Sequence, residues 1–191
     1  METSLRSQIL DHTTEIFTRV GLRFTMQEVA EEMHISKKTI YTEFPSKEAL
    51  LTAMLDRGFG LIQERKMEIL SSDLPGPQKL QEVMIALPDE FLSFDYRQMD
   101  HLEEKYPRTA ARLAYHLENN WEPVDLLIRQ GMEEGWLRKD LDLPILKISF
   151  SATLRSFLFS SALEQNRISY TQALERFMKM LMEGMLTRPA P

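Results

Sequence analysis

Cationic and hydroxyl side chains stand close together between residues 36 and 47. Lys37 and Lys38 follow Ser36 directly, and Thr39 comes next. Ammonium groups bind phosphate oxygens, and hydroxyl groups hydrogen-bond to phosphates or to the edges of bases. This stretch holds three lysines against one glutamate, although residues 1–50 hold six basic and eight acidic residues. The pattern indicates contact with a nucleic acid through a small basic patch on an otherwise acidic chain.

The residues around this patch predict two short helices joined by a tight turn. Thr25 and Glu28 have the spacing of a capping box, so a first helix should cover about residues 26–33. Ser36 is a good N-cap for a second helix, which Pro45 should end. Two short helices joined by a turn of three to four residues form a helix-turn-helix, whose second helix lies in the major groove of DNA.

The position of the two lysines supports this interpretation. Lys37 and Lys38 lie at the N-terminal end of the second helix, where cations oppose the helix dipole and lower helix stability. Such a helix end is more plausibly built to meet phosphates and base edges. The alternative is a solvated helix end that happens to carry two lysines, and charge alone does not decide between them.

A resemblance decides in favour of DNA. The residues that carry it are Ile35-Ser36-Lys37-Lys38-Thr39-Ile40-Tyr41, Phe44 and Ser46-Lys47-Glu48-Ala49-Leu50. This stretch resembles the DNA-binding domain of the TetR family of bacterial transcriptional regulators, over roughly fifty residues. Two positions depart from the family pattern, because His34 and Lys38 stand where glycine is common. A histidine can adopt the left-handed conformation at some cost, so the turn should survive, while Lys38 should alter which operator is bound.

The resemblance implies specific roles in binding a near-palindromic, double-stranded operator. Two residues at helix N-termini, Thr25 and Lys47, should hold phosphates, because backbone N–H groups there already favour anions. Residues of the second helix should read the major groove, and they are Ser36, Lys37, Lys38, Thr39 and Tyr41.

The whole chain is expected to be all-α, with no β-hairpin signal in its 191 residues. Residues 1–50 should form a three-helix, helix-turn-helix DNA-binding domain. Residues 51–191 should form a helical ligand-binding and dimerisation domain, as the resemblance implies. A long helix from Ser46 to about Leu70 should link the two domains mechanically.

The last two expected helices, 143–163 and 169–186, are apolar on more than one side. A helix that is apolar nearly all round must be covered on both sides. One side can face the core of this chain, and the other indicates a second copy, so we expect a homodimer. The alternative is a helix fully buried within one subunit. The interface residues that we expect are Ile148, Ala152, Phe159, Phe177 and Leu181.

Members of the family commonly bind a small-molecule effector in the C-terminal domain, and the resemblance implies one here. Methionine and aromatic side chains suit an adaptable apolar pocket, although at helical spacing they are more often plain core. We expect a hydrophobic or amphipathic effector and a role as a ligand-responsive repressor. The alternative is a regulator that responds to a partner protein and has no ligand. The candidate pocket residues are Met84, Phe91, Tyr96, Trp121, Met132 and Arg155.

Several other classes are not expected. The chain has no cysteine, no apolar run of membrane-spanning length and no signal-peptide pattern, so we expect a cytoplasmic protein without membrane contact. It lacks a Gly-rich phosphate loop, HExxH and GxSxG, so we expect no enzyme and no cofactor. His101 and His116 with nearby glutamates share no helix face, so we expect no metal site. A helical enzyme that depends on these histidines is the least favoured alternative.

Overall fold

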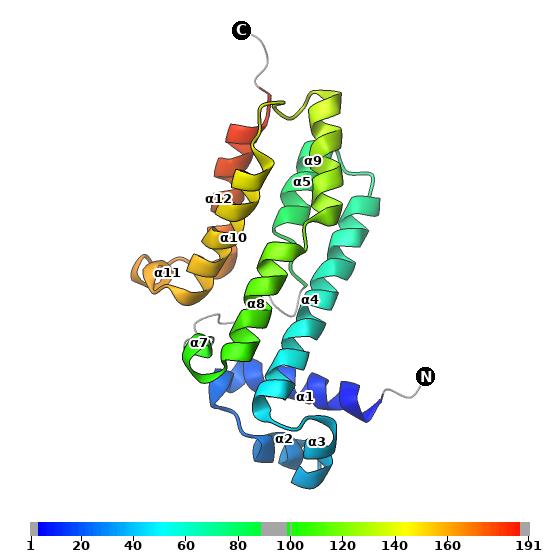
Figure 1. The fold of residues 1–191 in the computed structure, drawn as a ribbon, viewed down its shortest axis with the longest axis vertical. Helices are drawn as coiled ribbons and strands as arrows, with labels where there is room; N and C mark the ends of the chain where they lie inside the picture. The colour runs from blue at the N-terminus through cyan, green and yellow to red at the C-terminus, as the bar shows by residue number, and fades with distance from the viewer. Residues whose placement is uncertain (1–3, 89–98, 100, 188–191) are drawn as a thin grey trace. The chain divides into compact units, whose positions relative to one another are not determined.

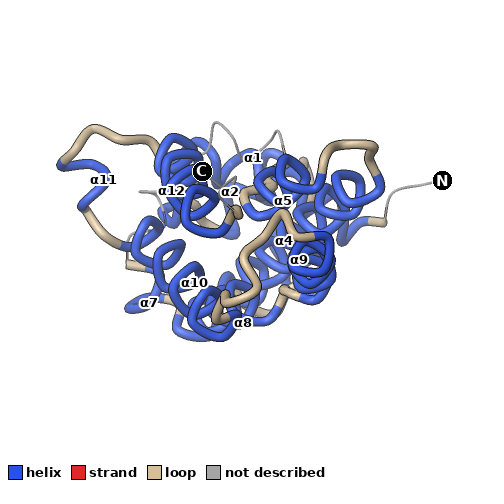
Figure 2. Tube along the Cα trace, turned by 90° about the horizontal axis from the view of Figure 1, so that it is seen from above, coloured by secondary structure: helices blue, strands red, loops and turns tan. Residues whose placement is uncertain are grey.

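The computed structural model describes residues 4–88, 99 and 101–187, and most of these residues lie in helices (Figure 1). Figure 2 shows helices and loops but no strand within this described part of the chain. Leu137 and Leu186 form an isolated antiparallel β-bridge. The prediction of an all-α protein with an N-terminal helix-turn-helix is therefore confirmed.

The chain divides into two compact units. The N-terminal unit consists of residues 1–60 and 94–115, and the C-terminal unit consists of residues 61–93 and 116–191. The long helix that the sequence predicts from Ser46 is present as α4 (Lys47–Ser71), and it contributes residues to both units. The expected functional division after residue 50 stays a prediction.

Local signals in the sequence set the helix ends of the N-terminal unit. Ser4 caps the first helix by accepting the N–H of Ser7, and Gly21 ends it with a left-handed φ of 61°. The Ser46 hydroxyl accepts the N–H of Ala49 at 3.1 Å and so caps α4. The other helices of this unit are α1 (Leu5–Val20), η1 (Gly21–Arg23), α2 (Met26–Glu32), α3 (Lys37–Glu43), α7 (Leu102–Lys105) and α8 (Pro107–Asn119), whose last residues belong to the C-terminal unit.

Helices α1, α2 and α3 pack around a small apolar core. Ile9 of α1, Val29 of α2 and Ile40 of α3 are fully buried, and Phe17 meets Phe24 edge to face with ring centroids 6.4 Å apart. Burying an aliphatic side chain of this size stabilises a fold by about 1.5–3 kcal/mol. This core holds the three helices of the helix-turn-helix region together.

The C-terminal unit is a separate helical body. Helices α5 and α9 lie side by side, as do α10 and α12 (Figures 1 and 2). Ser169 begins the last helix with a complete capping box to Gln172, as the sequence predicts. The helices of this unit, besides the end of α4, are α5 (Gly76–Met84), α9 (Glu122–Glu134), α10 (Leu143–Phe159), α11 (Ala162–Gln165) and α12 (Tyr170–Met185).

One expected helix is shorter than predicted. The sequence favours continuous helix to Leu163, but α10 ends at Phe159 because Ser160 adopts an extended conformation with ψ of 140°. The Ser160 hydroxyl then accepts the N–H of Ala162, and the short helix α11 follows. A serine that bonds to nearby backbone in this way competes with helix continuation.

The core of the C-terminal unit combines aliphatic, methionine and aromatic side chains. Trp121 meets Phe150 edge to face at 5.5 Å, and Phe150 stacks on Phe177 at 5.7 Å between ring centroids. The indole of Trp136 lies against Gly131, where a Cβ atom would come within 2.6 Å of the ring. Glycine is therefore required at this close approach of α9 to the indole.

Candidate nucleic-acid interface

Helix α3 is anchored from one side and leaves its polar residues exposed. Ile40 is the buried residue of the helix, with no exposed surface, and it faces the core. Ser36, Lys37 and Lys38 are exposed, and Tyr41 retains 43% of its surface. The structure therefore brings the expected major-groove residues together on one open side of α3, with Thr39 half-buried among them.

The N-terminal turn of α3 is ordered by its own hydroxyl groups. The Ser36 hydroxyl accepts the N–H of Thr39 at 3.0 Å, and the two hydroxyl oxygens lie 2.7 Å apart. The Lys37 ammonium lies 5.9 Å from the centre of the Tyr41 ring. Because the first turn of α3 contains no acidic residue, its two lysines keep a local positive potential beside the exposed N–H groups.

The turn between α2 and α3 has the conformation that the sequence requires. His34 adopts the left-handed region, with φ of 53°. Its N–H donates to the Glu31 carbonyl at 3.1 Å, and the Ile35 N–H donates to the Ala30 carbonyl at 3.0 Å. The prediction that a histidine can replace glycine in this turn is confirmed.

Thr25 is placed as a helix cap at an exposed position. Its hydroxyl accepts the N–H of Glu28 at 3.1 Å, and the Glu28 carboxylate accepts the Thr25 N–H at 2.6 Å. The capping box is therefore confirmed. Because Thr25 is exposed, its hydroxyl is open to a phosphate, and that contact stays a prediction.

Lys47 has a different environment from the one that we expected. Its ammonium donates to the carbonyl oxygen of Leu22 at 2.6 Å and also to that of Phe24. It lies 4.3 Å from the centre of the Phe24 ring and 5.4 Å from that of Tyr106. The side chain therefore ties α4 to the segment before α2, and a phosphate could reach the ammonium only in competition with these groups. The contact of Lys47 with DNA stays a prediction.

A residue that sequence reasoning did not single out also positions α3. The Arg6 guanidinium donates to the carbonyl oxygen of Glu43, the last residue of α3, at 2.8 Å, and it stacks 4.2 Å above the Phe44 ring. A cation near the C-terminal end of a helix is favourable. No sequence spacing could reveal this contact, because it joins residues 37 positions apart.

Of the four candidate pocket residues that the structure describes, three lie in or against one apolar core and the fourth is at the surface. Met84 and Trp121 are buried in the core, Met132 packs partly buried against it, and Arg155 is exposed. Phe91 and Tyr96 lie outside the described residues. A role for these six residues in ligand binding stays a prediction.

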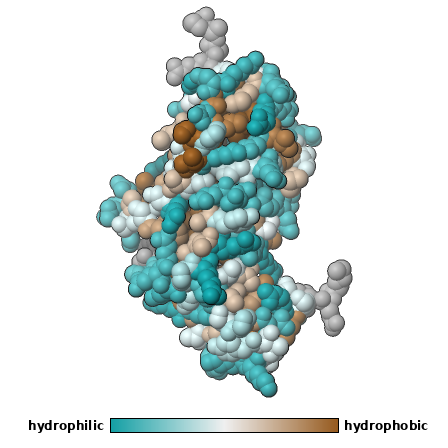
Figure 3. All heavy atoms as spheres, viewed as in Figure 1, coloured by the Kyte–Doolittle hydropathy of each residue, from teal (hydrophilic) through white to brown (hydrophobic). Residues whose placement is uncertain are grey.

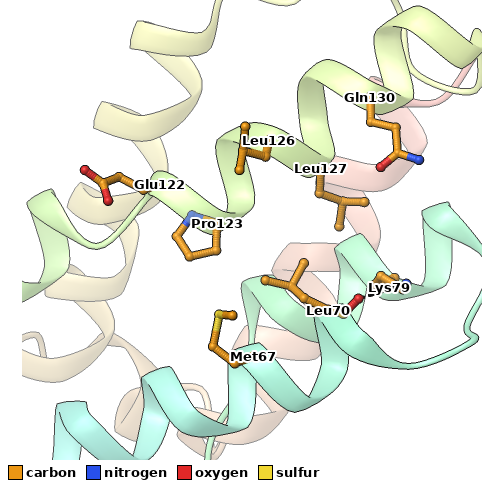
Figure 4. A pocket seen from close by; sticks show the side chains of 8 residues that line it. All are labelled: Met67, Leu70, Lys79, Glu122, Pro123, Leu126, Leu127 and Gln130. Atoms are coloured by element: carbon orange, nitrogen blue, oxygen red, sulfur yellow. Dashed lines mark hydrogen bonds between the residues drawn. The ribbon is translucent and has the colours of Figure 1, made fainter.

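An apolar groove of about 420 Å³ occurs instead on the C-terminal unit (Figure 4). Met67 and Leu70 of α4 face Pro123, Leu126 and Leu127 of α9 across it. Leu126 retains 71% of its surface, so the groove is open to solvent. The remaining lining residues are Lys79, Glu122 and Gln130.

The expected dimer residues fall into two classes. Ile148 retains 66% of its surface and Ala152 is exposed, whereas Phe177 and Leu181 pack partly buried against the core. Phe159 is also half-buried. Figure 3 shows hydrophobic side chains at the surface over α9 and α10, where Leu126, Ile145 and Ile148 are exposed. Ile145 and Ile148 therefore form an apolar face on α10 that the part of the chain described by the structure does not cover.

The two histidines that could in principle bind a metal have other neighbours. His101 and His116 each have a nearby partner, Glu104 at 3.1 Å and Asn120 at 3.2 Å respectively. Within the described residues, no group of three acidic, histidine or cysteine side chains could hold a metal ion. Nor is any helix in that part of the chain long and apolar enough to cross a membrane.

Comparisons with known proteins agree with the geometry of the N-terminal unit. Residues 9–54 match the family described as bacterial regulatory proteins, tetR family. The HTH-type transcriptional repressor KstR2 of Mycobacterium tuberculosis is 29% identical over 151 residues, which are 75% of this chain and 74% of KstR2. The solved structure of that regulator superposes with a TM-score of 0.57, at 20% identity over 98% of both chains.

A second solved structure shows the same fold. The transcriptional regulator FadR from Bacillus subtilis, in complex with stearoyl-CoA, superposes with a TM-score of 0.65, at 16% identity over 93% of this chain and 97% of FadR. At this identity the likeness shows the fold alone. The family match shows that residues 9–54 form a DNA-binding domain of the tetR family of bacterial regulatory proteins, and the rest of the chain is similar in fold to regulators that carry this domain.

Proposed function

We propose that the protein is a homodimeric transcriptional repressor that binds a near-palindromic operator through α3 and leaves it when a small effector binds the C-terminal unit. The observation that carries the DNA-binding part is the open polar side of α3, anchored by Ile40 and headed by Lys37 and Lys38. A helix held in this way can enter the major groove without unfolding its own core.

The homodimer is supported by the apolar face of α10. Ile145, Ile148 and Ala152 are exposed at intervals of three and four residues, so they lie along one side of the helix. Exposed apolar side chains in a row of this kind mark an interaction surface. Two-fold symmetry would present two α3 helices to half-sites separated by about one helical turn of DNA, roughly 34–36 Å, or a multiple of it.

The small effector is supported by relatives and by the composition of the C-terminal unit. KstR2 is named a repressor, and FadR was solved in complex with stearoyl-CoA, which is an amphipathic molecule. The open groove between α4 and α9 has mostly apolar walls. We therefore expect a hydrophobic or amphipathic effector for this chain.

Helix α4 is the element through which an effector could act. It begins with Lys47, next to the segment before α2, and ends at Ser71 in the C-terminal unit. An effector changes operator affinity only through its different affinities for two arrangements of the dimer. A swing from about 1:99 to 99:1 requires a preference of about 10⁴-fold, on the order of 5.5 kcal/mol, which two effector molecules could share.

Operator binding and release test this proposal directly. Full-length protein is used to select duplexes from a randomised library, and candidate compounds are then titrated against the selected duplex. Enrichment of a near-palindromic sequence, with loss of binding on addition of one compound class, is the expected result. Compounds that bind the protein tightly yet never alter DNA affinity would contradict the effector part and favour a partner protein.

A further inference from the structure

Two polar side chains lie on the inward side of α4 in the C-terminal unit. Gln63 and Lys66 are one helical turn apart, and Leu70 follows one turn after Lys66. Ile69 is buried in the core of the unit, and Leu70 packs against that core. Gln63 and Lys66 are themselves partly buried, so this side of α4 places two hydrogen-bond donors among apolar neighbours.

Neither donor is satisfied within the described part of the chain. The Gln63 side-chain nitrogen is buried and has no hydrogen-bond partner there. The Lys66 ammonium likewise meets no carboxylate in that part of the chain, and burial lowers the pKa of Lys66 from 10.5 to about 8. Buried donors without an acceptor are rare in folded proteins because each one costs free energy.

The other partly buried lysines of the same unit behave differently. The Lys79 ammonium donates to the carbonyl oxygen of Leu70 at 3.1 Å. The Lys147 ammonium pairs with the carboxylate of Asp125 at 2.5 Å. Lys66 is thus the exception among the partly buried lysines that the structure describes in this unit, and within that part of the chain its ammonium is available to an acceptor from a bound molecule.

The chemistry of the two donors defines that acceptor. An ammonium and a side-chain amide N–H₂ both donate, and a carboxylate is the compact acceptor that also supplies the opposite charge. The apolar groove borders the same side of α4, because Leu70, one turn after Lys66, is one of its lining residues. A carboxylate held at these donors could therefore extend an apolar body along the groove.

We propose that Gln63 and Lys66 receive the carboxylate of an apolar organic acid whose body lies against Leu70 and the α9 side of the groove. This site rests on the proposed ligand-responsive function for its regulatory meaning, but its binding chemistry can be measured without DNA. A straight-chain carboxylic acid is the simplest molecule that combines a carboxylate with an apolar body.

The test is calorimetric titration of the full-length protein with straight-chain acids from hexanoate to dodecanoate and with the matching primary alcohols. We expect at least one acid to bind about tenfold more tightly than its alcohol. Lys66→Met should weaken that acid about tenfold and leave the alcohol unchanged, and Gln63→Leu should weaken the acid a few-fold. Lys139→Met, at an exposed position of the same unit, is the matched control and should change neither.

Lys66→Arg keeps the positive charge, so this variant should still bind the acid more tightly than the alcohol. That result would show that the weaker acid binding of Lys66→Met comes from the missing charge and not from a general change in the fold. Equal binding of acid and alcohol, no binding of any acid, or an unchanged acid affinity in a folded Lys66→Met protein would overturn the proposal. An acid that binds through Lys66 yet leaves operator affinity unchanged contradicts the effector role alone. Failure of the protein to bind any duplex would contradict the proposed function and leave this site standing.

Discussion

The Lys47 ammonium donates a 2.6 Å hydrogen bond to the carbonyl oxygen of Leu22, and so joins the first turn of α4 to the segment that leads into α2. The same ammonium lies over the Phe24 ring. A charged donor that meets two carbonyl oxygens and an aromatic face contributes to stability even without DNA. Lys47 therefore has a structural role that its place at a helix N-terminus does not reveal.

Lys47→Met should lower the free energy of unfolding by about 1–3 kcal/mol, because the carbonyl oxygens of Leu22 and Phe24 lose a charged donor. Urea unfolding followed by circular dichroism measures this change. The control is Lys38→Met, whose side chain is exposed and should alter the value by less than about 0.5 kcal/mol. Equal stability of the two variants would show that the contacts of Lys47 are not formed in solution.

The Lys37→Ala, Lys38→Ala double variant should fold with unchanged or slightly higher stability. Both lysines are exposed at the N-terminal end of α3, where each cation is unfavourable by about 0.3–1 kcal/mol. Thermal unfolding of the double variant and the wild type tests this expectation. A marked loss of stability would mean that the two lysines stabilise the fold. Their position at the end of α3 would then be no argument for DNA binding.

Ile148→Glu should give a folded monomer. Ile148 is 66% exposed in the single chain, so a carboxylate there costs the subunit little but is costly in a buried interface between two subunits. Light scattering at micromolar concentration should report a dimer for the wild type and a monomer for this variant. Lys139→Glu, at an exposed position outside α10 and α12, is the control and should leave the dimer unchanged. Phe177→Glu is a poorer test, because Phe177 stacks on Phe150 within the chain. A wild-type monomer would end the dimer proposal.

Lys66 should make the free energy of unfolding depend on pH between about pH 8 and pH 10.5. Burial holds its pKa at about 8 in the folded chain against 10.5 when exposed, so between these values the unfolded chain binds more protons at this residue. The free energy of unfolding should therefore rise with pH across this window, by up to about 3 kcal/mol. Lys66→Met should be more stable than the wild type near neutral pH, with the difference shrinking as the pH rises. A difference that does not change with pH would contradict the burial of the ammonium.

Local signals in the sequence predicted the helix-turn-helix well. The capping box of Thr25 and Glu28 and the left-handed turn at His34 depend on residues within a few positions of one another. Their spacing alone therefore specifies the structure. The same holds for the capping box at Ser169.

Contacts between distant residues were beyond such reasoning. The partners of Lys47 lie 23 and 25 positions away, and Arg6 reaches Glu43 across 37 positions. The end of α10 at Phe159 was missed because neither proline nor glycine marks it. Lys66 was missed because a lysine in a run of charged residues, Glu64-Arg65-Lys66, is expected to be solvated, and only the packing of the unit shows that it is partly buried.

Binding of the wild type and of the Lys37→Ala, Lys38→Ala variant to one selected duplex tests the central claim most directly. Fluorescence anisotropy at several salt concentrations gives the affinity and its salt dependence for both proteins. The variant should bind at least tenfold more weakly and show a shallower salt slope, by about one unit for each phosphate that it no longer neutralises. An unchanged affinity and an unchanged salt slope in a folded double variant would contradict the assignment of α3 as the DNA-binding helix.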